Sequence, residues 1–180
     1  MDFQLRRARS YIQAGAVIAY PTEAVYGLGC DPLNPSAVQR LIQLKQRSAH
    51  KGLIILASHP AQLLPYVDWR GEWIQQVLTS WPGPYTWLLP ALPNLPYGLQ
   101  GEHQTIACRV TAHPIAAALC ETVGHAVVST SANQSGKAAA RSAFQVQQRC
   151  PNIDWILRGS VGGLTHATPI QDACTGIRIR

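Results

Sequence analysis

One uncharged stretch, residues 129–136, concentrates side chains that could hold an anion by hydrogen bonds. It reads S-T-S-A-N-Q-S-G and follows a short apolar run, residues 126–128, that is typical of a strand. Because Ser, Thr and Asn readily bond their own backbone, an ordinary turn is one interpretation. The other is an oxyanion cradle, in which hydroxyl and backbone N–H groups at a strand end face a phosphate or a carboxylate.

Two groups of cations could supply the charge that such a cradle needs. Lys45, Arg47 and Lys51 follow a predicted helix and directly precede an apolar strand. That order places them at the rim of a sheet, where α/β proteins bind ligands, although they could also simply complement the helix dipole. Arg109 falls inside an apolar strand pattern, and a buried cation needs an anion. That anion is either an internal salt-bridge partner or a carboxylate or phosphate of a ligand.

A loop with two glycines is predicted at residues 21–31, where the sequence reads P-T-E-A-V-Y-G-L-G-C-D. Thr22 offers a hydroxyl at the end of a strand, and Tyr26 offers an aromatic face. Gly27 and Gly29 would let the backbone approach a ligand closely. An ordinary surface loop fits the same pattern.

The composition fits a globular chain with an anionic partner. Its 180 residues suit one domain, 1–180, and 47% of them are apolar against 13% charged. The net charge of +6 reflects a scarcity of acidic residues, and 12 of the 15 cations are Arg. Because Arg binds phosphate and carboxylate in bidentate fashion, this composition fits a nucleotide or RNA.

Several classes of site are disfavoured by the remaining residues. The five cysteines form no C-x-x-C pair, which argues against disulfides and zinc and favours a cytoplasmic location; Cys108 and Cys120 are predicted to fill the core. The six histidines show no i, i+4 spacing, so no protein-held metal is predicted. No apolar run approaches the length of a membrane span, so no membrane partner is expected.

Strands alternate with helices along the chain, which predicts an α/β fold with a mixed sheet. A helix is expected to begin at Asn34, as a capping amide, with Pro35 in its first turn. The other predicted helices are residues 2–14, 60–66, 71–80, 113–120 and 142–150. The predicted strands are residues 17–20, 53–57, 85–89, 105–110, 126–128 and 155–157, with a last edge strand at 177–179.

Five motifs, in this order, resemble those of the YrdC/TsaC family of threonylcarbamoyl-AMP synthases. They are P-T-E-x-V-Y-G-L-G-C-D, K-x-R followed by Lys51, P-G-P-x-T, R-V-T-x-H-P and S-T-S-A-N-x-S-G. The resemblance covers nearly the whole chain and is to the short bacterial form. It implies a single-domain, twisted, open mixed sheet with flanking helices and a concave basic face. It also implies that L-threonine, bicarbonate and ATP react to L-threonylcarbamoyladenylate and pyrophosphate, for N6-threonylcarbamoyladenosine modification of tRNA.

Site roles follow from the resemblance by motif position. The residues implied to contact threonine are Thr22, Arg109, Ser129 and Thr168. The residues implied to bind ATP are Lys45, Arg47, Lys51, Thr105, Ser131, Asn133, Ala139 and Arg178, with Lys45 and Arg47 as the catalytic pair. The chain departs from the family at residues 167–170, which read A-T-P-I where relatives commonly have P-S-x-I. The hydroxyl is kept there, but the proline has moved by one place.

This chemistry needs positioning and charge neutralisation more than a covalent nucleophile, and the chain has no nucleophile elbow and no suitably spaced pair of carboxylates. Mg²⁺ is expected with ATP, held mainly by the phosphates. The expected partners are separate bacterial threonylcarbamoyl-transferase proteins and tRNA itself. The alternative hypothesis is a non-catalytic module that binds tRNA or rRNA through the same basic cleft.

Overall fold

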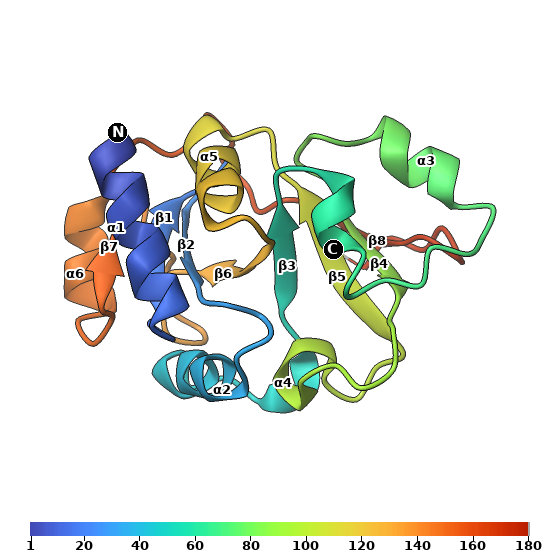
Figure 1. Cartoon of the computed structure of the whole chain (residues 1–180), viewed down its shortest axis with the longest axis horizontal. Coiled ribbons are helices and arrows are strands. Elements are labelled where there is room, and N and C mark those ends of the chain that lie inside the picture. Colours follow the sequence, from blue (N-terminus) through green and yellow to red (C-terminus); the bar gives the residue numbers. More distant parts are fainter. Residues whose placement is uncertain (180) are drawn as a thin grey trace.

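A mixed sheet of eight strands forms the centre of the computed structural model, which describes residues 1–179 (Figure 1). The strand order is β7-β1-β2-β6-β3-β5-β4-β8, with parallel pairs β1–β7, β3–β5 and β4–β8 and antiparallel pairs elsewhere. The predicted α/β fold with a mixed sheet is therefore confirmed; the domain bounds 1–180 stay a prediction. The strands are β1 (Ile18–Pro21), β2 (Tyr26–Gly29), β3 (Ile54–Ala57), β4 (Thr86–Pro90), β5 (Thr105–Val110), β6 (Val127–Ser131), β7 (Trp155–Ile156) and β8 (Ile170–Asp172).

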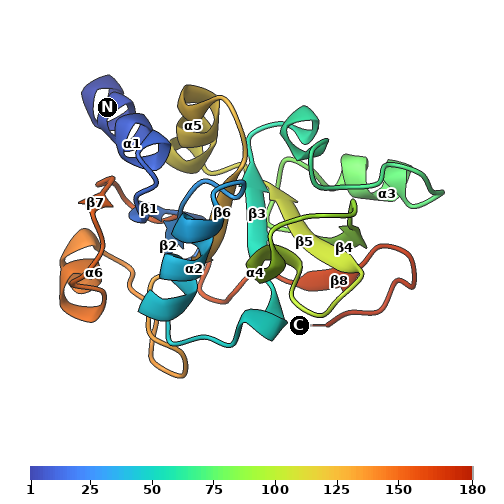
Figure 2. The same cartoon turned by 60° about the horizontal axis from the view of Figure 1, so that its bottom comes forward.

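Helices cover both faces of this sheet (Figure 2). On one face, α1 (Asp2–Gln13) and α5 (Pro114–Val123) pack against Ile18, Leu56 and Val127. Their sequence neighbours Val17, Ile55 and Val128 point to the opposite face and join the larger core, because successive side chains of a strand alternate between faces. The helices that contribute to this larger core are α2 (Pro35–Leu44), α3 (Ile74–Thr79), α4 (Tyr97–Gln100) and α6 (Ala143–Arg149).

Local capping chemistry explains the starts of α2 and α5. Oδ1 of Asn34 accepts a hydrogen bond from the backbone N of Ala37 at 3.1 Å, as the sequence predicts. The imidazole of His113 caps α5 in the same way, with Pro114 in the first turn. Two predicted helices are shorter in the structure than the sequence suggests. The helix predicted at 60–66 is a 3-10 turn at Pro60–Leu63, and the helix predicted at 71–80 is α3.

The prediction of a loop at residues 21–31 is wrong, because β2 lies inside it and pairs antiparallel with β1. Glycine-rich strands are difficult to predict because Gly has little intrinsic preference for a strand. Gly29 serves packing rather than a ligand: a Cβ there would lie 2.2 Å from the carbonyl oxygen of Val128 and 2.8 Å from the ring of Tyr20. Tyr26 is also buried, so its aromatic face is not offered to a ligand.

Two further differences concern strand ends. Strand β6 continues to Ser131, so the first hydroxyls of the 129–136 stretch belong to a strand and the turn follows them. The predicted edge strand at 177–179 contributes one isolated bridge, between Gln171 and Arg178, while the strand beside β4 is β8.

Two smaller expectations concern cysteines and membranes. Cys108 and Cys120 are fully buried and burial raises the pKa of both thiols, which confirms them as core residues. Among residues 1–179, no helix has the length and apolar character needed to cross a membrane.

Candidate active site

A cavity of ≈ 630 Å³ lies over the part of the sheet that α1 and α5 leave uncovered. Its floor is a row of cross-strand partners: Ile54 on β3 pairs with Ser129 on β6 and with Ala107 on β5. Ala107 in turn pairs with Leu88 on β4. Arg109 stands two residues further along β5, on the same face and at the border with the covered part. The small side chains of Ala107 and Ser129 leave room for a ligand on this floor.

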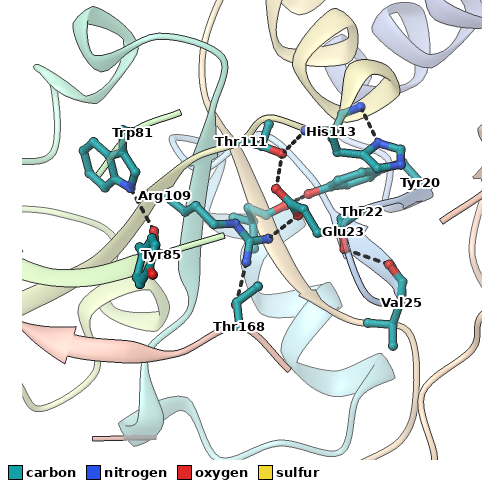
Figure 3. A network of polar contacts seen from close by, with 12 residues as sticks. Tyr20, Thr22, Glu23, Val25, Trp81, Tyr85, Arg109, Thr111, His113 and Thr168 are labelled. Atoms are coloured by element: carbon teal, nitrogen blue, oxygen red, sulfur yellow. Dashed lines mark hydrogen bonds and ion pairs between the residues drawn. The ribbon is translucent and has the colours of Figure 1, made fainter. Parts of the chain in front are cut away.

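At one end of the cavity, Arg109 belongs to a buried polar network (Figure 3). Its Nη1 donates to Oγ1 of Thr168 at 2.6 Å, and its Nη2 lies 3.3 Å from Oε2 of Glu23. Oε1 of Glu23 accepts a hydrogen bond from the hydroxyl of Thr111 at 2.6 Å. The buried cation predicted from the sequence thus has an internal carboxylate, while Arg109 itself still lines the cavity. We call Thr22, Arg109, Ser129 and Thr168 the carboxylate end.

The loop between β1 and β2 closes this end. Thr22 is buried, and its hydroxyl donates to the carbonyl oxygen of Val25 at 2.7 Å. The hydroxyl oxygen keeps lone pairs that can accept a hydrogen bond from a ligand. The hydroxyl of Tyr26 donates to the carbonyl oxygen of Gly159 at 2.5 Å, which fastens β2 to the segment after β7.

At the other end, Lys45 stands behind the cavity wall rather than in it. Its side chain is 3% exposed, and Nζ donates to the carbonyl oxygens of Ser131 at 2.5 Å and Asn133 at 3.0 Å. Nζ also donates to Oδ1 of Asn133 at 3.1 Å, and the hydroxyl of Ser131 donates to that same oxygen at 2.6 Å. Burial, together with the nearby charge of Arg47, lowers the pKa of Lys45 to about 8. Lys45 therefore shapes the turn that carries Ser131 and Asn133.

The remaining cations of this end lie at the rim. Arg47 is half-buried and its Nη2 donates to the carbonyl oxygen of Gly52 at 3.1 Å, while Lys51 is exposed. Ser131 and Asn133 also line the cavity. We call Arg47, Lys51, Ser131 and Asn133 the phosphate end.

Most of the predicted site residues thus surround one cavity. Lys45 and Arg178 do not line it: Lys45 is buried behind the wall, and Arg178 lies on the segment that follows β8, next to the lining residue Ile179. The residues that do line it are Thr22, Arg47, Lys51, Thr105, Arg109, Ser129, Ser131, Asn133, Ala139 and Thr168. Their individual roles stay predictions.

Comparison with known proteins identifies the family. Residues 10–177 match the Sua5/YciO/YrdC family model, whose description is "Telomere recombination". The chain belongs to the Sua5/YciO/YrdC family. It is 52% identical over 184 residues to the threonylcarbamoyl-AMP synthase of Alkalilimnicola ehrlichii. This alignment covers 99% of this chain and 95% of that relative. The threonylcarbamoyl-AMP synthase of Halorhodospira halophila is 47% identical over 180 residues, and the alignment covers 99% of this chain and 94% of that relative.

Solved structures of the Sua5/YciO/YrdC family share the fold. The crystal structure of P. abyssi Sua5 complexed with L-threonine has a TM-score of 0.89 at 33% identity, over 96% of this chain and 51% of that one. The chain thus spans about half the length of Sua5. E. coli YciO gives a TM-score of 0.82 at 26% identity, over 96% of this chain and 84% of that one.

Two residues of the site were missed by sequence reasoning. Lys137 lines the phosphate end and directly follows the S-T-S-A-N-Q-S-G stretch, so its position beside that motif was the available signal. Glu23 stands next to Thr22 within the first family motif, and the need of Arg109 for an anion pointed to one of the few acids in the chain.

A second cavity, of ≈ 640 Å³, lies between α1, α6 and β7. Its carboxylate, Asp154, already binds Nη2 of Arg40 at 2.9 Å and the backbone N of Val17 at 2.8 Å. It is lined by none of the predicted site residues of this Sua5/YciO/YrdC chain. The cavity over the sheet is therefore the candidate active site.

Proposed function

We propose that this protein is a threonylcarbamoyl-AMP synthase, which forms L-threonylcarbamoyladenylate and pyrophosphate from L-threonine, bicarbonate and ATP. Its curated relatives with 44–52% identity carry that name. The observation that carries the proposal is that one cavity joins an oriented arginine at one end to a group of cations, hydroxyls and an amide at the other. Such a cavity suits an amino acid and a triphosphate side by side.

L-threonine is assigned to the carboxylate end. The guanidinium of Arg109 suits a carboxylate, and its Nε is a buried donor without a hydrogen-bond partner among residues 1–179. The hydroxyl oxygen of Thr22 can accept from the amino group, and the hydroxyls of Ser129 and Thr168 complete the polar surface. The crystal structure of P. abyssi Sua5 in complex with L-threonine supports L-threonine as the substrate.

ATP is assigned to the phosphate end. Arg47 and Lys51 would hold the phosphates, with Lys137 as a further cation at the rim. The side chains of Ser131 and Asn133, fixed by Lys45, would contact the same phosphates. Thr105 and Ala139 would line the nucleoside, and Arg178 stays a prediction for the nucleotide. Lys45 acts here by holding the turn rather than by touching a phosphate.

The chemistry then follows from proximity. The amine of threonine combines with bicarbonate to give a carbamate and water. A carbamate oxygen attacks the α-phosphorus, the bond from phosphorus to the bridging oxygen breaks, and pyrophosphate leaves with the electron pair. Holding the two reactants in line and neutralising the phosphates supplies the rate enhancement.

Mg²⁺ would neutralise charge on the phosphates. No carboxylate lines the cavity within the described part of the chain, so Mg²⁺ would be held mainly by phosphate oxygens and water. Separate proteins that transfer the threonylcarbamoyl group to tRNA, tRNA itself as a ligand and a cytoplasmic location stay predictions.

Pyrophosphate release tests this function. We expect release from ATP only when L-threonine and bicarbonate are both present, together with a product whose mass equals threonylcarbamoyl-AMP. The names of the relatives do not favour the alternative of a non-catalytic RNA-binding module. Purified protein that binds tRNA but releases no pyrophosphate with all three substrates would restore that alternative.

A further inference from the structure

Glu23 is a buried carboxylate to which none of the substrate contacts above assigns a role. Its exposed fraction is 8%, and it belongs to the loop that follows β1, with its carboxylate directed toward Arg109 and Thr111 (Figure 3). Oε1 accepts from the hydroxyl of Thr111 at 2.6 Å, and Oε2 lies 3.3 Å from Nη2 of Arg109. Oε1 is hydrogen-bonded, whereas Oε2 makes the ion pair with Arg109 but no hydrogen bond among residues 1–179, and Glu23 does not line the cavity.

These contacts fix the direction of the Arg109 guanidinium. Glu23 makes an ion pair with Nη2, while Nη1 donates a hydrogen bond to Oγ1 of Thr168 at 2.6 Å. Thr111, which orients Glu23, is fixed in turn: its backbone N donates to the carbonyl oxygen of Ala57 at 2.9 Å, and its hydroxyl oxygen accepts from the backbone N of His113 at 3.1 Å. A guanidinium with one hydrogen bond at Nη1 and one ion pair at Nη2, both to groups that are themselves fixed, is presented to the cavity in one orientation.

Glu23 also fastens the segment that follows β7 over the carboxylate end. Its carbonyl oxygen accepts from the backbone N of Leu164 at 3.2 Å, and the carbonyl oxygen of Thr22 accepts from the backbone N of Gly162 at 2.9 Å. A Cβ at Gly162 would lie 2.6 Å from the carbonyl oxygen of Glu23, so the two backbones pack closely. This segment leads to Thr168, the second residue that holds Arg109.

The charge of Glu23 changes the electrostatic field at this end. A carboxylate 3.3 Å from the guanidinium, both largely removed from water, cancels much of the positive field of Arg109. A monocarboxylate needs one oriented pair of donors, and these remain. A polyphosphate needs surplus positive charge, which the cations at the phosphate end supply.

We propose that Glu23 is the positioning residue that reserves the carboxylate end for the amino acid and keeps polyphosphate at the phosphate end. It acts through Arg109 and does not touch the substrate. This inference rests on the proposed function, since it concerns the sorting of L-threonine and ATP between the two ends.

The test compares Glu23→Gln with the unchanged protein. Glutamine keeps the size and an acceptor for Thr111 but removes the charge. We expect the KM for L-threonine to rise by about tenfold or more, and the KM for ATP to stay within about twofold. Tripolyphosphate should compete with ATP alone in the unchanged protein, and with both ATP and L-threonine in Glu23→Gln. Loss of general structural support would not create this new inhibition pattern.

Three further variants separate charge from structure. Glu23→Asp keeps the charge, so tripolyphosphate should again compete with ATP alone. Thr111→Val removes the hydroxyl that orients Glu23 and should raise only the KM for L-threonine, by about threefold to tenfold. Glu121→Gln removes a carboxylate from the exposed side of α5 and should change neither KM. Should Glu23→Gln fail to fold, the Thr111→Val kinetics decide.

Equal rises of both KM values, or an unchanged KM for L-threonine without the new competition, would overturn the role of Glu23. Absence of turnover by the unchanged protein with all three substrates would instead overturn the proposed function. In that case calorimetry still tests whether Glu23 separates the two anions. The affinities of L-threonine and of tripolyphosphate would be measured for the unchanged protein and for Glu23→Gln. Identical affinities in the two proteins would refute it.

Discussion

The two ends of the cavity hold positive charge in opposite ways. At the carboxylate end, Arg109 is 5% exposed and lies against Glu23 and Thr168. At the phosphate end, Lys51 and Lys137 are exposed at the rim, and no carboxylate lines the cavity within residues 1–179. One end offers an oriented and partly neutralised guanidinium, and the other offers surplus charge on exposed side chains.

The contrast matches what each ligand demands. A small amino acid has few groups, so its binding depends on donors and acceptors in fixed positions. A triphosphate carries several charges and tolerates mobile lysines, provided that enough cations surround it. Lys45 belongs to neither pattern, because it is a buried cation whose Nζ donates to oxygens of Ser131 and Asn133. It therefore fixes the turn of the phosphate end without lining the cavity.

The largest effect should come from Lys45→Met. Methionine fills a similar volume but leaves the carbonyl oxygens of Ser131 and Asn133 without their donor. We expect kcat/KM for ATP to fall by about a hundredfold or more, in steady-state assays of pyrophosphate release. The matched variant Lys137→Met, at an exposed position, should cost less than about tenfold. Similar losses in the two variants would remove the distinction between a buried organiser and a rim cation.

A smaller, salt-dependent effect should follow from Lys51→Gln. Because Lys51 is exposed, its attraction for the triphosphate is screened by salt. We expect ATP binding, measured by calorimetry, to weaken by about fivefold at low ionic strength and by less than about twofold at 0.5 M salt. Binding of L-threonine should not change. A loss of equal size at both ionic strengths would place Lys51 in a desolvated contact instead.

Much of the candidate site can be predicted from the sequence. The physical reason is that its hydroxyl, amide and cationic residues lie in or beside loops that adjoin short strands. The pattern around residues 129–136 indicates both the turn and the hydroxyls, and the motif positions lead to residues such as Thr22 and Ser131 that share one cavity. The spacing around residue 109 indicates a buried cation that needs an anion.

The rest depends on tertiary packing that no local pattern reveals. Lys45 ends a helix like any exposed lysine, and only the approach of the 131–135 turn buries it. Strand β2 is hidden by its glycines, because Gly29 is required by the closeness of Val128 and Tyr20 rather than by a strand preference. The pairing of Glu23 with Arg109 joins residues far apart in the chain.

Acidification should destabilise the folded protein through His113. Burial lowers the pKa of His113; the nearby Arg109 lowers it too, while the Ser160 carbonyl and Glu23 oppose the shift. The unfolded state therefore takes up a proton as the pH falls below about 6.5 while the folded state resists, so the free energy of unfolding falls by at most about 1.4 kcal/mol per pH unit. Urea unfolding at several pH values measures this.

The matched variant His113→Asn keeps an N-cap acceptor for α5 but has no titrating group. Its stability should therefore depend less on pH between pH values of about 5 and 6.5. The same pH dependence in both proteins would assign the effect to another group.

The smallest effect concerns Mg²⁺. Within the described residues, no group of three His, Cys, Asp or Glu residues could hold a metal ion. We therefore expect no stoichiometric binding of Mg²⁺ to the nucleotide-free protein by calorimetry, and a requirement for Mg²⁺ once ATP is present. A tight Mg²⁺ site without nucleotide would show that the protein contributes ligands of its own.

The division of the cavity is tested most directly by the same substitution at both ends, Arg109→Lys and Arg47→Lys, with KM determined for both substrates. Lysine keeps the positive charge, so Glu23 still faces a cation in Arg109→Lys. It lacks the planar pair of donors that arginine offers. We predict a crossed pattern: Arg109→Lys raises the KM for L-threonine by about tenfold and leaves that for ATP unchanged, and Arg47→Lys does the reverse. If both variants raised the same KM, or each raised both equally, the two substrates would not occupy separate ends.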